Sequence, residues 1–120
     1  MKKEERSFRE YMEDMIESID KILKYIGTIS SVNDFLNNDL VIDAVTRNYE
    51  IIGEAANKIP LEIRAKYPEV PWKQMYGLRN FAVHDYHKID HIILWEIAQD
   101  HLLKNKTMLE SILKTESSQD

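Results

Sequence analysis

The sequence contains no cysteine, and its 120 residues include only three glycines and three prolines. The absence of cysteine excludes disulfide bonds, thiolate zinc sites and cysteine nucleophiles. No apolar run approaches the roughly 18 residues that a membrane span needs, and the charged residues 1–5 do not resemble the start of an export signal. We therefore expect a cytoplasmic protein without a membrane segment.

Basic residues are outnumbered, because 16 Lys and Arg stand against 21 Asp and Glu and give a net charge of −5. This balance argues against a protein that is held to nucleic acid by its overall charge. Hydrophobic residues make up 43% and charged residues 31%, which is typical of a folded domain. The length indicates one domain over residues 1–120, with residues 1–4 and 115–120 frayed.

Apolar residues recur every three or four positions, which is the spacing of one face of a helix. The pattern predicts a long helix over residues 5–26 that stops at Gly27, followed by a short helical turn near residues 34–36. A second long helix is expected from a cap at Asn38 or Asp39 to Pro60.

The second half of the chain shows the same helical spacing. A connector over residues 60–71 holds one helical turn, and a third helix begins near Pro71 and runs through His84. Asp90 is expected to cap the last helix. Strand-like alternation is absent, so we predict an all-α, antiparallel bundle of four or five helices. Second apolar lines, such as Ile93 with Ile97, fit either a dimer interface or a thicker core.

The segment from Arg79 to Tyr86 holds polar groups that packing does not require. Histidine exchanges a proton near neutral pH, and the arginine fork binds phosphate oxygens, so the pair suits metal-free phosphodiester cleavage. Arg79 and His84 are five positions apart, about 140° around a straight helix. Either the helix ends near His84, or Arg79 leans across the helix, or a second subunit completes the site. A surface arginine with a helix-terminal histidine is the plainer interpretation.

Two further groups of polar residues need an explanation. His84, His87 and His91 would share a face of an unbroken helix and bind a divalent ion, but a cap at Asp90 would break that helix and separate them. Asn48 lies on an apolar stripe and needs a hydrogen-bond partner if it is buried. Gly53 within the same helix indicates a close approach by a neighbouring helix.

The segment Arg79-Asn80-x3-His84-x-Tyr86 resembles the R-x4-H-x-Y signature of the HepT-like ribonuclease toxins, a branch of the HEPN superfamily. Residues 47–56 are similar to the second-helix block of that family, and residues 67–72 to the proline-tryptophan entry to its motif helix. Asp90-x4-Trp95 resembles the start of its last helix. The resemblance covers most of residues 5–113.

The resemblance implies a HEPN-like bundle that dimerises through the motif helices, and a metal-independent endoribonuclease in a type VII-like toxin–antitoxin module. Arg79 would hold the scissile phosphate, His84 would act in acid–base catalysis and Asn80 would orient one of them. Arg47 and Asn48 would support the site. The implied partner is a minimal nucleotidyltransferase antitoxin, which attaches AMP to Tyr86. No cofactor or metal is implied.

One residue departs from the family pattern, since Asp85 stands where a small neutral residue is expected. Its carboxylate would favour the imidazolium form of His84 and repel RNA. The charge around the motif points the other way, because residues 58–88 carry a net charge of +3. The cations in this stretch are Lys58, Arg64, Lys66, Lys73, Arg79 and Lys88. Paired in a dimer, two such stretches would form a cationic cleft, in which Tyr76 and Tyr86 could stack on bases.

Two other functions fit the same residues. In the first, the chain is a catalytically silent helical module that binds a nucleotide or a nucleotidyltransferase partner, and Arg79 and His84 hold a phosphate without reaction. In the second, it is a structural dimeric bundle. These hypotheses differ in whether the motif side chains converge on a cleft.

Overall fold

The computed structural model describes residues 6–80 and 88–117. This part of the chain is helical without a strand, which confirms the all-α prediction. His84, Tyr86 and their neighbours Asp85 and His87 lie outside the described residues. The described helices are α1 (Phe8–Ile26), α2 (Val32–Leu36), α3 (Asp39–Asn57), α4 (Leu61–Lys66), α5 (Trp72–Gly77), α7 (Lys88–Asp100) and α8 (Leu102–Ser117).

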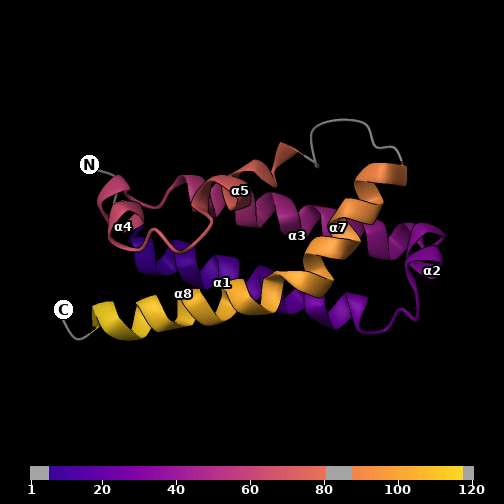
Figure 1. The fold of residues 1–120 in the computed structure, drawn as a ribbon, viewed down its shortest axis with the longest axis horizontal. Coiled ribbons are helices and arrows are strands. Elements are labelled where there is room, and N and C mark those ends of the chain that lie inside the picture. The colour runs from indigo at the N-terminus through magenta and orange to yellow at the C-terminus, as the bar shows by residue number, and fades with distance from the viewer. Residues whose placement is uncertain (1–5, 81–87, 118–120) are drawn as a thin grey trace, which may run out of the picture.

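The long helices α1 and α3 lie side by side and form the centre of the bundle (Figure 1). α8 packs along α1, and α5 packs on α3. α2 lies at one end of the bundle, where it contacts α3 and α7 (Figure 1). These helices bury their apolar faces against one another. The fully buried residues include Met15 and Ile19 of α1, Tyr49 and Ile52 of α3, and Leu109 of α8.

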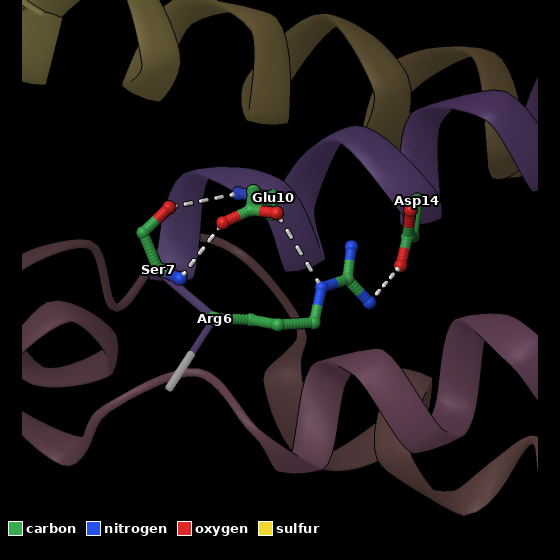
Figure 2. A network of polar contacts seen from close by, with 4 residues as sticks. All are labelled: Arg6, Ser7, Glu10 and Asp14. Atoms are coloured by element: carbon green, nitrogen blue, oxygen red, sulfur yellow. Dashed lines mark hydrogen bonds and ion pairs between the residues drawn. The ribbon is translucent and has the colours of Figure 1, made fainter. Parts of the chain in front are cut away.

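A capping box fixes the beginning of α1 at Phe8, three residues after the predicted start (Figure 2). The Ser7 hydroxyl accepts a hydrogen bond from the Glu10 backbone N–H at 3.3 Å, and the Glu10 carboxylate accepts one from the Ser7 backbone N–H at 3.2 Å. Arg6 bridges Glu10 and Asp14 on the exposed side (Figure 2). The two capping hydrogen bonds satisfy backbone donors that the first helical turn leaves free.

Asn38 caps α3, as predicted, since its side-chain oxygen accepts a hydrogen bond from the Val41 backbone N–H at 3.1 Å. The helix ends at Asn57, three residues before the Pro60 that was expected to stop it. The Arg64 guanidinium donates to the carbonyls of Ile59 and Asn57 at 2.8 and 3.0 Å. The end of α3 is therefore closed by a side chain from α4, which the apolar pattern does not reveal.

The predicted helix through residues 72–84 is interrupted. α5 ends at Gly77, and residues 78 and 79 form a turn. Arg79 lies in that turn, whereas His84 lies outside the described residues, so the angle between them stays a prediction.

The last predicted helix is two helices, α7 and α8, with a break at His101. α7 already includes Lys88, so Asp90 lies in its first turn and is not the N-cap. A carboxylate there is still favourable, since it faces the positive end of the helix dipole. At the other end, residues 115–117, which were expected to be frayed, form the last turn of α8.

Aromatic side chains fasten α7 to the bundle. Phe35 of α2 and Trp95 of α7 have ring centroids 5.4 Å apart. The buried Tyr49 hydroxyl donates a hydrogen bond to the Leu94 carbonyl at 2.8 Å, and burial raises the pKa of Tyr49. Among the described helices, none is both long enough and apolar enough to cross a bilayer.

Candidate active site

Arg79 lies in the turn that follows α5, where its side chain is half-buried. The guanidinium carbon lies 5.1 Å from the centroid of the Tyr76 ring, a cation–π contact. Within residues 6–80 and 88–117, no carboxylate forms an ion pair with Arg79. The ring thus restrains the guanidinium without neutralising it, and its N–H groups can bind a phosphate.

Gly53 of α3 is the residue against which this turn packs. A Cβ atom at Gly53 would lie 2.6 Å from the Arg79 backbone nitrogen, 2.9 Å from the Arg79 Cβ and 3.0 Å from the Tyr76 carbonyl oxygen. The close approach predicted from a glycine inside a helix is therefore confirmed. The backbone of α3 at Gly53 is thus in direct contact with the backbone at Arg79, 26 positions later in the sequence.

Asn48 is buried, with 6% of its surface exposed. Its side-chain Nδ2 donates to the Ala44 carbonyl at 2.8 Å, whereas its Oδ1 is buried and accepts no hydrogen bond from any described residue. A buried acceptor without a donor costs about 1–3 kcal/mol. Asn48 therefore has a hydrogen-bond partner for its side-chain N–H group, within its own helix, but none among the described residues for its side-chain oxygen.

The other predicted site residues within the described part of the chain lie mostly at the surface. Arg47 is exposed and pairs with Glu50 at 2.8 Å, so the described chain does not bring it to Arg79. Asn80 and Lys73 are exposed, Asn80 directly after Arg79 and Lys73 on α5. Tyr76 is 36% exposed while its ring contacts Arg79. The backbone of Lys88 begins α7.

Two of the cations counted near the motif serve the fold. Arg64 closes the end of α3, and Lys66 pairs with Glu116 of α8 at 2.8 Å. The Tyr67 hydroxyl also donates to Glu116. These two hydrogen bonds and the Lys66 charge hold the pKa of the Glu116 carboxyl below its usual value. The cationic excess that remains for a ligand is smaller than the sequence predicted, since Glu116 neutralises Lys66.

A cavity of about 460 Å³ lies between α5, α7 and α8, and no predicted site residue lines it. Its walls are Pro71, Gln74, Met75, Gly77, Leu78, Ile97, His101 and Asn105. No group of three or more His, Asp or Glu side chains with the spacing of a metal site occurs in the described ranges. The His84–His87–His91 hypothesis falls largely outside those ranges, because only His91 is described.

A profile of the family described as "Ribonuclease HepT-like" matches residues 15–114. The chain belongs to the HepT-like ribonuclease family. The match spans α3, the turn that carries Arg79 and the two C-terminal helices. The resemblance seen in the four sequence blocks is thereby confirmed.

Individual HepT-like relatives cover nearly the whole chain. "Putative RNase MJ1380" of Methanocaldococcus jannaschii is 39% identical over 107 residues, which is 89% of this chain and 97% of the relative. "Probable ribonuclease HepT" of Thermococcus cleftensis is 34% identical over 109 residues, 91% of this chain and 98% of the relative. No solved structure matches significantly. The family and these names indicate a ribonuclease, a hydrolase that acts on RNA.

Proposed function

We propose that this protein is the toxin of a type VII-like toxin–antitoxin module, a cytoplasmic endoribonuclease that cleaves RNA without a metal ion. The observation that carries the proposal is the state of Arg79. Its guanidinium rests on the Tyr76 ring, is half-buried, and lacks a carboxylate partner among the described side chains. An arginine held in this way keeps its fork of N–H donors available to an anion. In a HepT-like ribonuclease that anion is the RNA phosphate.

The reaction is attack by the ribose 2′-OH on the adjacent phosphorus. His84 takes the proton from the 2′-OH, or gives a proton to the departing 5′-oxygen. The bond from phosphorus to the 5′-oxygen breaks, which leaves a 2′,3′-cyclic phosphate and a 5′-hydroxyl. Arg79 donates hydrogen bonds to the phosphate oxygens as negative charge builds on them, and Asn80 orients Arg79 or His84.

The active form is a homodimer in which two motif segments face one another. The second apolar lines support this assembly, since Ala44, Ile51, Ile93 and Ile97 are all left half-buried by the single chain. A dimer would cover these side chains and gain free energy from their burial. Lys73 and Lys88 would then line the cleft with Arg79, and the exposed part of Tyr76 would be free to contact an RNA base.

The activity is controlled by a partner, a minimal nucleotidyltransferase antitoxin that transfers AMP from ATP to Tyr86. A bulky, anionic group at Tyr86 would sit two residues from His84 and repel the RNA phosphate. The alternative is a catalytically silent module, in which Arg79 and His84 bind a nucleotide or the partner without cleaving RNA.

The test is cleavage of a panel of RNAs by the purified protein in EDTA, with His84→Ala as the variant and His101→Ala as the control. His101 is exposed at the break between α7 and α8, and the family resemblance gives it no role in the site. We expect cleavage by the wild type and His101→Ala, and none by His84→Ala at equal helix content and dimer mass. Cleavage by His84→Ala at the wild-type rate would refute the mechanism. A tight nucleotidyltransferase complex with no RNA turnover would favour the silent module.

A further inference from the structure

We propose that Gly53 is a positioning residue for catalysis, whose missing side chain sets the place of the Arg79 backbone and hence of its guanidinium. This inference rests on the proposed function, in which Arg79 binds the scissile phosphate. It adds a residue of α3 that lies 26 positions before Arg79 in the sequence.

The contact is between backbones and leaves no room for a side chain. The atoms that a Gly53 Cβ would meet include the Arg79 nitrogen at 2.6 Å and the Tyr76 oxygen at 3.0 Å, and neither can rotate away as a side chain would. The φ angle of Gly53 is not positive, so an alanine would be at ease in the helix itself. The need for glycine is therefore steric, and the three atoms nearest to the added Cβ all belong to Tyr76 and Arg79.

The segment with Arg79 is the part that would yield to an added methyl group. α3 is fixed by the fully buried Tyr49 and Ile52 before Gly53 and by the buried Ala56 after it, and it packs along α1. Residues 78 and 79, in contrast, form a turn after a six-residue helix. Restoring ordinary contact at 3.4 Å from 2.6 Å would move the Arg79 backbone by about 0.8 Å. Displacing a catalytic group by about 1 Å can cost about 100-fold in rate.

α3 also holds the opposite flank of the motif segment. Tyr49, one helical turn before Gly53, donates its hydroxyl to Leu94 of α7, and residues four apart lie on one face of a helix. The chain before the motif is thus fixed at Gly53 and the chain after it at Tyr49. A change at Gly53 shifts only the first of these attachments, so we expect the fold and the dimer to persist.

The experiment compares Gly53→Ala with Gly77→Ala in the RNA cleavage assay. Gly77 is the matched control, because a Cβ atom there meets nothing within 4 Å. We expect Gly53→Ala to lower kcat by about 10- to 100-fold with KM changed less than about threefold, since Arg79 acts mainly as charge builds in the transition state. Gly77→Ala is expected to keep the wild-type kcat and KM.

A double-variant comparison separates positioning from general destabilisation. In an Arg79→Ala background, Gly53→Ala is expected to cause less than about a twofold further loss, because the residue it positions is gone. An equal loss in both backgrounds would overturn the proposal, as would a folded Gly53→Ala protein with the wild-type kcat. If the wild type cleaves no RNA, the proposed function fails. The positioning is then judged by the NMR shift of the Arg79 Nε–Hε group, which Gly53→Ala should move and Gly77→Ala should not.

A measurement on the wild type covers the case in which Gly53→Ala does not fold. The Gly53 Hα protons and the Arg79 amide proton should give a strong nuclear Overhauser cross-peak, because a Cβ built at Gly53 lies 2.6 Å from that amide nitrogen. Absence of this cross-peak from an assigned spectrum would overturn the proposed contact.

Discussion

The hydrogen bond between Tyr49 and Leu94 offers a quantitative test of how α7 is held in place. Tyr49 is fully buried, and its hydroxyl donates to the Leu94 carbonyl at 2.8 Å. Tyr49→Phe removes this hydrogen bond and keeps the ring. The Leu94 carbonyl stays within α7, where it can still accept from its own helix. The substitution therefore does not leave a wholly unpaired carbonyl.

The expected cost is about 1 kcal/mol of unfolding free energy, the net value of a typical buried hydrogen bond, in a range of about 0.5–1.5 kcal/mol. For a chain of this size that corresponds to a drop in the melting temperature of roughly 3–6 °C. Thermal and urea unfolding followed by circular dichroism at the helix band would measure it. Tyr49→Phe should lower the RNA cleavage rate less than Gly53→Ala does, because Tyr49→Phe does not displace Arg79.

Tyr25→Phe is the matched control for Tyr49→Phe. Tyr25 is half-buried on α1, and its hydroxyl forms no hydrogen bond within the described part of the chain. Its removal should change the melting temperature by less than about 1 °C, since surface substitutions usually cost under about 0.5 kcal/mol. Equal losses from the two substitutions, or no loss from Tyr49→Phe, would refute the reasoning about this contact.

Two further predictions concern buried polar groups. Because Lys66 and Tyr67 depress the pKa of Glu116, the stability that its carboxylate contributes is present above pH 4.5 and is lost as the pH falls through the lowered pKa. Glu116→Gln should therefore melt earlier at pH 7 and lose less stability below pH 4.5; parallel pH profiles of the melting temperature would contradict this. Asn48→Leu removes a buried oxygen that accepts no hydrogen bond from the described residues, so it should keep or raise the melting temperature while RNA cleavage falls if Asn48 supports the site. A sharp loss of stability with unchanged cleavage would show that Asn48 serves only the fold.

The sequence predicted the features that are local. Asn38 as a cap, the short helix α2 and the turn of helix between residues 60 and 71 were all expected, and each depends on residues within a few positions of one another. The close approach at Gly53 was also expected, because a glycine that lowers helix stability is kept for a reason outside its helix. The pattern did not reveal which segment approaches.

The features that were missed depend on contacts between distant residues. The end of α3 is set by Arg64, and the last turn of α8 by the contacts of Glu116 with Lys66 and Tyr67. The breaks at residues 78–79 and at His101 interrupt apolar patterns that stay helical across them. Side-chain spacing alone cannot show where a backbone turns if both sides keep the same period. The placement of Arg79 followed from such a turn.

The most direct test of the central claim uses an RNA that the protein cleaves, with one 2′-deoxy nucleotide at the scissile position and EDTA in the buffer. If the 2′-OH is the nucleophile, this single change should abolish cleavage at that bond, while the unmodified RNA yields a 2′,3′-cyclic phosphate and a 5′-hydroxyl. Cleavage of the deoxy-substituted bond at the unmodified rate, or loss of all activity in EDTA, would contradict a metal-free attack supported by Arg79 and His84.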